Sequence, residues 1–327
     1  MKPNSWRFVV ISLSAVVLVG CGSSSAGRSG ASGSGSTAPA SATTTAVGVE
    51  VTGGFGSKPT VTIPNKPAPA NFAEQVLTQG DGPVVAKGDT LVANYSGQTW
   101  APKDGKPHVF DSSFDRGQPI AFLIGVGRVI PGWDKALVGK KVGTRVLLSL
   151  PPADGYGSAG QSTAGITGTD TLVFLVDVVA TYRPDAAAPG TVVANTTGTN
   201  VPKLDNVPGK KPTIVSTSGL RPPTSPISTL LVTGTGDKID PNKTLVLQLV
   251  QTDLATGKKT QSTWGRAPQT VAAKQVLGLA GKLSDQNIGS RAVVLVPATA
   301  KTAATATQAA SPGTPPTILI IDVVGQF

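Results

Sequence analysis

The feature that most constrains the fold of this chain is an internal duplication. Four short segments of the first half return in the same order in the second half. The separation falls from 154 positions, between Thr90 and Thr244, to 145 positions, between Asp177 and Asp322. The paired segments are 58–61 with 211–214, 90–92 with 244–246, 143–145 with 289–291, and 177–179 with 322–324. Repeats in a fixed order predict that one folding unit occurs twice and that the second copy is shorter.

The duplication also predicts where the domains begin and end. We expect a first domain at 48–183 and a second domain at 202–327. Residues 184–201 between them are rich in Pro, Ala, Gly and Thr, a composition typical of a linker. The falling separation indicates that the second copy has lost residues between the positions that match 95–110, and again between those that match 120–130.

Within the first copy, apolar runs and alternation predict short strands at 89–97, 142–150 and 171–181. A helix is expected at 131–138, because Pro131 suits a first helical turn and Gly139 can end it. These patterns by themselves indicate a mostly β domain with a little helix.

The beginning of the chain is typical of an export signal. Lys2 and Arg7 precede an apolar run at 8–19, which is too short for an ordinary membrane span. The run ends in Leu18-Val19-Gly20-Cys21, which resembles the signal of bacterial lipoproteins, in which the cysteine receives a lipid. Cys21 is the only cysteine, so it cannot form an internal disulfide. An ordinary secretory signal that happens to contain a cysteine is the alternative.

This resemblance implies a signal peptide at 1–20 and a lipidated Cys21 that anchors the protein outside the bacterial cytoplasmic membrane. Residues 21–47 are mostly Gly, Ser, Ala and Thr, and we expect a flexible tether there. Twenty-five residues of such a tether reach roughly 27 Å.

Two motifs of the first copy indicate a family. Phe110-Asp111-Ser112-Ser113 and Val129-Ile130-Pro131-Gly132-Trp133 resemble the F-D-S-S and V-I-x-G-W motifs of the FKBP-type peptidyl-prolyl cis-trans isomerases, which bind tacrolimus. The resemblance covers about 85–180. It implies an α+β fold with two FKBP-like domains, each a bent antiparallel sheet that wraps a short helix.

The resemblance also implies a proline-sized pocket. Its expected catalytic residues are Tyr95, Asp111, Trp133 and Tyr156. Its expected substrate-binding residues are Phe110, Ile120, Phe122, Val129, Ile130, Ile166 and Phe174. Two departures concern its rim: Ile120 stands where many members have phenylalanine, and the loop at 158–169 is rich in Gly, Thr and Ala.

The expected chemistry needs no metal and no cofactor, because rotation about an X–Pro bond breaks no covalent bond. The barrier of about 18–20 kcal/mol comes from lost C–N conjugation, and an apolar slot favours the less polar twisted form. The expected partners are proline-containing exported or unfolded polypeptides, the membrane through the lipid, and tacrolimus-like macrolides. His108, the only histidine, is expected to be exposed.

Composition argues against nucleic-acid binding. The net charge is +10, from 28 basic and 18 acidic residues, but the basic residues form no block longer than a pair. Aromatic residues do not alternate with them as they do in single-strand binders.

The second copy retains apolar strands and loses the pocket. Leu249, Gln261, Ala272 and Leu279 are expected where the first copy has Tyr95, Asp111, Phe122 and Trp133, and Thr302 is expected where it has Tyr156. These replacements predict a degenerate FKBP-like domain without activity. They also leave open a second function for the whole chain, that of a non-catalytic polypeptide-binding adaptor or chaperone.

Overall fold

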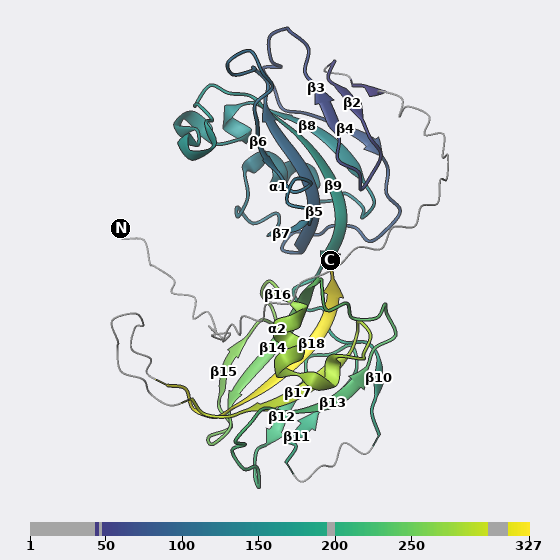
Figure 1. Ribbon diagram of the computed structural model, residues 1–327, viewed down its shortest axis with the longest axis vertical. Coiled ribbons are helices and arrows are strands. Elements are labelled where there is room, and N and C mark those ends of the chain that lie inside the picture. Colours follow the sequence, from purple (N-terminus) through teal and green to yellow (C-terminus); the bar gives the residue numbers. More distant parts are fainter. Residues whose placement is uncertain (1–42, 46–47, 195–199, 300–312) are drawn as a thin grey trace, which may run out of the picture. The chain divides into compact units, whose positions relative to one another are not determined.

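A computed structural model describes residues 43–45, 48–194, 200–299 and 313–327. The expected signal peptide, Cys21 and most of the tether lie outside these residues, as does Thr302. Two antiparallel sheets dominate the described part of the chain, and each carries one short α-helix (Figure 1). The predicted α+β class, with strands in the majority, agrees with this architecture.

The first sheet has the strand order β4-β8-β9-β5-β6, and β7 also pairs with β5. Its strands are β4 (Ala73–Thr78), β5 (Thr90–Thr99), β6 (Val109–Ser112), β7 (Ile120–Leu123), β8 (Arg145–Leu150) and β9 (Leu172–Tyr182). The long central strand β9 lies between β8 and β5, and its first seven residues are all buried. The strands expected from apolar runs are therefore present, with ends shifted by up to three residues.

The helix α1 (Pro131–Leu137) covers one face of this sheet. Pro131 occupies its first turn, as predicted, and the helix ends one residue earlier than expected. Trp133, Ala136 and Leu137 are buried in one cluster with Leu148, Leu150 and other residues of the sheet. This cluster is the main core of the first sheet.

The opposite face of the first sheet is covered by a small sheet that the sequence did not reveal. It is formed by β1 (Thr43–Thr44), β2 (Glu50–Thr52) and β3 (Thr60–Thr62). Val49 and Val51 pack against Leu147 of β8, whose neighbour Leu148 belongs to the helix-side core. Successive residues of a strand point to opposite faces, so β8 supplies both cores.

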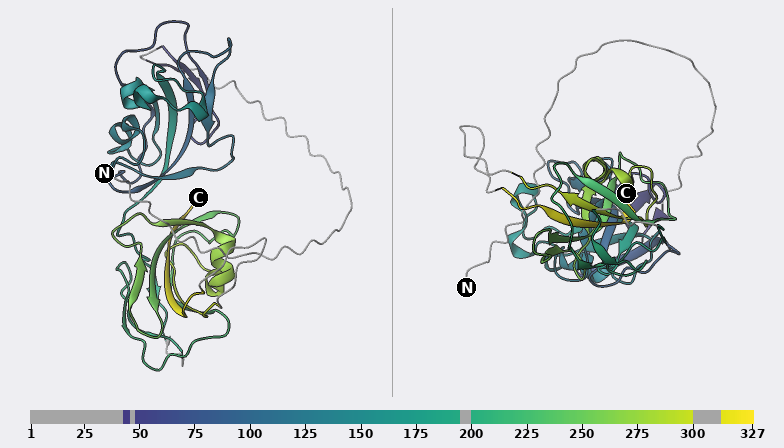
Figure 2. Two further views of the ribbon diagram at one scale, coloured as in Figure 1. Left: turned by 90° about the vertical axis from the view of Figure 1, so that its left-hand side faces the viewer. Right: turned by 90° about the horizontal axis from the view of Figure 1, so that it is seen from below.

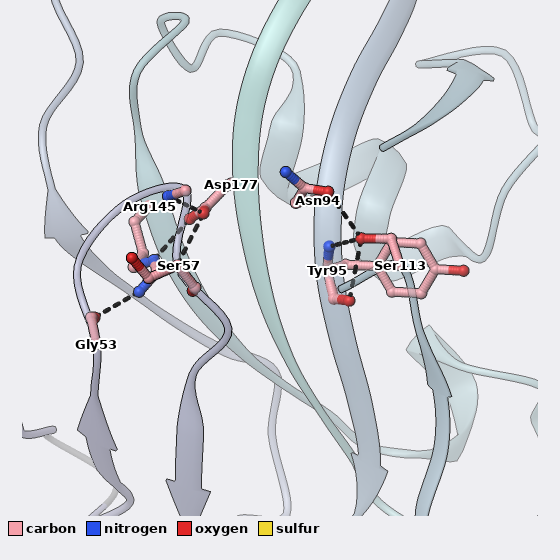
Figure 3. Close-up of polar contacts among 8 residues, drawn as sticks. Gly53, Ser57, Asn94, Tyr95, Ser113, Arg145 and Asp177 are labelled. Atoms are coloured by element: carbon pink, nitrogen blue, oxygen red, sulfur yellow. Dashed lines mark hydrogen bonds and ion pairs between the residues drawn. The ribbon is translucent and has the colours of Figure 1, made fainter. Parts of the chain in front are cut away.

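We call residues 48–66, which include β2 and β3, the strap of the first sheet. A buried ion pair attaches this strap to the sheet (Figure 3). Arg145 donates from Nε to Oδ1 of Asp177 at 2.6 Å and from Nη2 to Oδ2 at 2.8 Å. The same guanidinium donates to the carbonyls of Gly53 and Ser57, and the amide of Gly56 donates to Asp177. The polar groups of the pair are thus satisfied partly by each other and partly by the strap, and a buried pair needs such hydrogen bonds to offset its desolvation.

The second sheet has the order β10-β13-β17-β18-β14-β15, and β16 pairs with β14. Its elements are β10 (Thr191–Val192), β13 (Ile227–Thr233), β14 (Thr244–Asp253), β15 (Lys259–Ser262), β16 (Gln269–Ala272), β17 (Arg291–Val296), β18 (Thr317–Gln326) and α2 (Ala273–Leu279). Figure 2 shows α2 lying along one face of this sheet. Apart from β10, the pairing of each strand repeats the pairing in the first sheet.

The second sheet also has a strap, a hairpin of β11 (Lys203–Asp205) and β12 (Thr213–Ser216). Arg291 makes a two-point ion pair with Asp322 at 2.5 and 2.7 Å. It also donates to Asn206 and to the carbonyl of Lys210. The repeated segments therefore supply a matching buried ion pair to each sheet. Arg145 pairs with Asp177 in the first sheet, and Arg291 pairs with Asp322 in the second.

Two expectations for the second half need correction. The first part of the expected linker at 184–201 packs on the second sheet. Its strand β10 pairs with β13, and the buried Ala188 donates its amide to Asp322. The strand register places Val271, not Ala272, at the position of Phe122: Val271 lies opposite Leu245 as Phe122 lies opposite Leu91. The expected match to Ala272 was one residue off because the connection between β15 and β16, residues 263–268, is one residue shorter than the connection between β6 and β7, residues 113–119.

Candidate active site

A cavity of about 540 Å³ opens between α1 and the first sheet. It is lined by Tyr95, Phe110, Asp111, Phe122, Gly127, Arg128, Val129, Ile130, Pro131, Trp133, Gly155, Tyr156 and Phe174. The structure thus brings together all the sequence-predicted site residues except Ile120 and Ile166. These two belong to the core beneath the cavity, where Ile166 is buried and Ile120 is half-buried.

Trp133 is the centre of the aromatic part of the cavity. Its indole meets the rings of Tyr95, Phe122 and Phe174 edge to face, at centroid distances of 5.2, 5.0 and 5.4 Å. Edge-to-face pairs of this kind contribute about 0.5–1.5 kcal/mol each beyond the area they bury. The first turn of α1 therefore holds a rigid apolar floor, with the indole only 4% exposed.

The absence of a side chain at Gly97 allows the aromatic wall to form. A Cβ at this position of β5 would lie 2.6 Å from a ring atom of Phe174 and 2.8 Å from a ring atom of Phe110. Those two rings pack edge to face at 5.5 Å directly over the glycine. Any other residue at 97 would push the wall into the cavity.

The acidic side of the cavity is a cluster of three side chains. The hydroxyl of Tyr95 donates to Asp111, which is the contact expected from the sequence. Arg116, which the sequence did not reveal, pairs with Asp111 and donates from Nη2 to the Tyr95 hydroxyl at 2.8 Å. Ser113 accepts from the amide of Tyr95 at 2.8 Å and donates to Asn94, which fixes β5 against the turn after β6 (Figure 3).

This cluster fixes the charges of the site. Burial alone would raise the pKa of Asp111, but hydrogen bonds from Tyr95 and Arg116 outweigh it and lower that pKa below its ordinary value. Burial and the hydrogen bond to Asp111 raise the pKa of Tyr95 to about 12. Burial, and then the charge of Asp111, raise the pKa of Tyr156. Asp111 is therefore an anion and both tyrosines are neutral throughout the physiological range.

Two polar groups at the edge of the cavity are available to a ligand. Within the described residues, neither the amide of Ile130 nor the hydroxyl of Tyr156 makes a hydrogen bond. Asp134 of α1 accepts from the amides of Gly125 and Gly127 at 2.6 and 2.7 Å. Asp134 therefore fixes the loop that carries Val129 and Ile130. In the sequence, the only indication of this role is that Asp134 lies in the first turn of the helix.

The loop at 157–169 directly follows Tyr156 of the cavity. It contains two short 3-10 turns, Gly157–Ala159 and Ser162–Ala164. Lys103, in the loop between β5 and β6, donates to the carbonyl of Gly165 at 2.7 Å and pairs with Asp170 at 2.9 Å. The loop is thus held by Lys103 and by the buried Ile166.

The expectation that His108 is exposed is wrong. Its side chain is half-buried between Phe110 and Gly165, because the loop at 157–169 folds over it. In the described part of the chain, no group of histidine, cysteine, aspartate or glutamate side chains has the arrangement of a metal site. None of the described helices is long and apolar enough to cross a membrane.

Comparisons with known proteins find one matching family and several relatives. Residues 82–179 match the family described as FKBP-type peptidyl-prolyl cis-trans isomerase. An FK506-binding protein of Streptomyces anulatus is 38% identical over 123 residues, which make up 38% of this chain and 96% of that protein. An FK506-binding protein of Neisseria meningitidis serogroup A is 38% identical over 107 residues, 33% of this chain and 93% of that protein. The crystal structure of FkpA from Escherichia coli is 38% identical, with 34% of this chain and 48% of that chain covered and a TM-score of 0.30.

The fold and the site define a protein with an aromatic-lined cavity between an antiparallel sheet and a short helix. The chain belongs to the FKBP-type peptidyl-prolyl cis-trans isomerase family and is an isomerase of that type. The family match ends at residue 179 and therefore rests on the first sheet alone.

Proposed function

We propose that this protein is a lipid-anchored isomerase that acts outside the cytoplasmic membrane on the X–Pro bonds of exported polypeptides. The observation that supports the catalytic part is the cavity itself, where an aromatic floor, an ionised Asp111 and two free hydrogen-bonding groups converge. A proline-peptide isomerisation assay tests this part.

The proposed mechanism uses the polarity of the cavity. A proline ring fits against Trp133, Phe122 and Phe174, with Val129 and Ile130 beside it. In this slot the planar, polar imide loses water contacts, and the twisted form, which is less polar, is favoured. A barrier lower by about 4 kcal/mol corresponds to roughly a thousandfold faster rotation.

The polar groups hold the peptide on either side of the ring. The amide of Ile130 and the hydroxyl of Tyr156 donate to substrate carbonyls, which keeps the flanking chain fixed while the imide turns. Asp111 lies at the imide carbonyl, and Tyr95 and Arg116 hold its carboxylate in place. Because this constellation is preorganised, it costs little to assemble in the transition state.

We also propose that tacrolimus-like macrolides compete for this cavity. The relatives from Streptomyces and Neisseria carry binding of FK506 in their names. The loop at 158–169 differs in composition from that of many members, so we expect weaker binding than is usual in the family.

Export and anchoring rest on the first 21 residues. Cys21→Ser should abolish lipid attachment, because the thiol is the only acceptor in the motif Leu18-Val19-Gly20-Cys21. The measurement is incorporation of labelled palmitate, together with membrane fractionation, in a bacterial host that processes lipoproteins. Ser25→Ala is the matched control and should keep the label. Equal labelling of the Cys21→Ser protein would refute the anchor and leave the isomerase proposal untouched.

We propose that the second sheet is a degenerate FKBP-like domain. Its strands pair as in the first sheet, and its strap is held by the matching pair Arg291–Asp322. Leu249 occupies the place of Tyr95, because its amide donates to Thr263 as that of Tyr95 donates to Ser113. The connection corresponding to residues 124–130 is absent, and with it the backbone that carries Val129 and the amide of Ile130.

Residues 184–327 produced alone should therefore fold but not catalyse. We expect strand-rich circular dichroism, cooperative unfolding, and proline-peptide rates equal to the uncatalysed rate. Residues 48–183 are the control and should accelerate the reaction. Acceleration by 184–327 comparable to that of the control would contradict the loss of the pocket.

A second candidate function is a polypeptide-binding adaptor without catalysis. The observation in its favour is that half of the chain retains the sheet without the cavity lining. The two functions differ in one measurement: an adaptor delays aggregation of an unfolded client but leaves the proline-peptide rate unchanged.

A further inference from the structure

Arg128 lines the cavity, and the proposed mechanism gives it no role. Among the lining residues, only Arg128 and Asp111 carry a charge at neutral pH, because the lining tyrosines stay neutral. Asp111 pairs with Arg116. The side chain of Arg128 is exposed and makes no ion pair or hydrogen bond within the described residues. Its guanidinium is therefore free to bind a charged ligand at the open edge of the cavity.

The backbone that carries Arg128 is fixed on both sides. Before it, the amides of Gly125 and Gly127 donate to the two carboxylate oxygens of Asp134, at 2.6 and 2.7 Å. After it, the next two residues pack against the core and lead directly into α1. Asp134 is the acidic group that faces this loop from α1, and no ion pair joins it to Arg128 in the described structure. The position of Arg128 is thus fixed, while its long side chain can turn toward a ligand.

The arrangement of the cavity indicates which part of a bound peptide passes Arg128. The proposed mechanism places the imide carbonyl, which precedes the proline, at Asp111. The charge of Asp111 contributes to the raised pKa of Tyr156, so these two groups lie toward the same side of the cavity. The amide of Ile130 belongs to the loop of Arg128, and the carbonyl left for it is that of the proline itself. The residue that follows the proline therefore leaves the cavity beside Arg128.

The chemistry of a free guanidinium favours an acidic side chain at this place. Arginine is always charged, and its planar fork donates two parallel hydrogen bonds to one carboxylate. An amide of the same shape offers one acceptor and no charge. Because Arg128 is exposed, the carboxylate keeps part of its water, and salt weakens the attraction. The expected preference is therefore modest and depends on ionic strength.

We propose that Arg128 determines substrate specificity, and that its guanidinium binds the carboxylate of an aspartate or glutamate that directly follows the proline. The isomerase consequently acts faster on Pro-Asp and Pro-Glu segments than on the corresponding Pro-Asn and Pro-Gln segments. This inference rests on the proposed use of the cavity, and it names the class of substrate that the cavity prefers.

The test compares two peptides that differ only in glutamate or glutamine directly after the proline. Both continue beyond this residue and end in an amide, so that no terminal carboxylate contributes. A protease-free fluorescence assay at pH 7 gives kcat/KM for the full-length protein. At an ionic strength of about 0.01 M we expect kcat/KM to be about three- to fivefold higher for the glutamate peptide, mainly through KM. The ratio should approach one at about 1 M, where the screening length falls from about 30 Å to about 3 Å.

Two substitutions at Arg128 test the guanidinium itself. Arg128→Gln should bring the ratio of the two kcat/KM values to about one, and Arg128→Glu should reverse it. Lys87→Gln is the matched control, because it removes one exposed positive charge that lies against Gly125 of the same loop but outside the cavity lining. The Lys87→Gln protein should keep the preference for the glutamate peptide. In the unaltered protein, glutamate placed directly before the proline should give no preference.

Equal kcat/KM values for the two peptides at low ionic strength would overturn the proposal. So would an unchanged preference in the Arg128→Gln protein, or an equal loss of preference in the Lys87→Gln protein. Calorimetric titration of the same peptides separates this inference from the proposed function. A folded protein that binds the glutamate peptide more tightly, but leaves both peptides at the uncatalysed rate, would refute the proposed function and support the role of Arg128.

Discussion

Trp133→Ala should lower kcat/KM for proline peptides by about 10- to 100-fold. The indole is the floor against which the proline ring packs, and loss of one buried apolar side chain is worth about 1.5–3 kcal/mol. Three aromatic neighbours, Tyr95, Phe122 and Phe174, lose their central contact at the same time. Catalysis and binding should both suffer, because the slot becomes wider and wetter.

Trp133 is also part of the core, so loss of stability must be separated from loss of the site. Trp133→Leu keeps apolar volume and should still lower kcat/KM. Trp100→Leu is the matched control: Trp100 is equally buried, at 6% exposure, but packs in the cluster on the strap side of the sheet. It should cost stability and leave kcat/KM nearly unchanged. Equal losses of activity from both leucine variants would show that the indole acts only through the fold.

Arg145→Ala should destabilise the first sheet by about 3–5 kcal/mol. The change leaves Asp177 buried as an unpaired carboxylate and removes both donors to the carbonyls of Gly53 and Ser57. The strap would lose its main polar attachment, and the apolar cluster beneath it would become accessible to water. The midpoint of urea inactivation, followed by isomerase activity, reports on this part of the chain alone.

Lys58→Ala is the control for the Arg145 prediction, because Lys58 and Asp115 form an ion pair whose side chains are 64% and 51% exposed. It should leave the midpoint almost unchanged, since water and salt screen an exposed pair. Arg145→Met with Asp177→Leu should cost less than Arg145→Ala alone, because it leaves no buried charge. A double variant as unstable as the single one would show that the ion pair is not what holds the strap.

The sequence predicts those residues of the pocket that lie within one short motif. The segment at 129–133 combines a helix start, a tight approach at Gly132 and the floor residue, so its structure follows from neighbouring residues. Ile120 and Ile166 were predicted to line the cavity but lie in the core beneath it. The direction of a single side chain at a strand start or in a loop depends on packing, which a motif does not determine.

Groups that act across long sequence separations could not be predicted. Arg145 and Asp177 were visible as repeated residues, but only the register of β8 with β9 shows that they face each other. The strap strands β2 and β3 have three residues each, too few for alternation to indicate a strand. Arg116 reaches Asp111 and Tyr95 from the turn after β6, and its role arises from distances that the sequence does not contain.

The central claim is that this chain catalyses rotation about X–Pro bonds in the cavity around Trp133. The most direct measurement is the cis-to-trans rate of a proline tetrapeptide with the protein from residue 22 onward, with and without tacrolimus. We predict a rate that rises in proportion to protein concentration and falls when tacrolimus is added in excess. A folded protein that leaves the peptide at its uncatalysed rate would contradict the account.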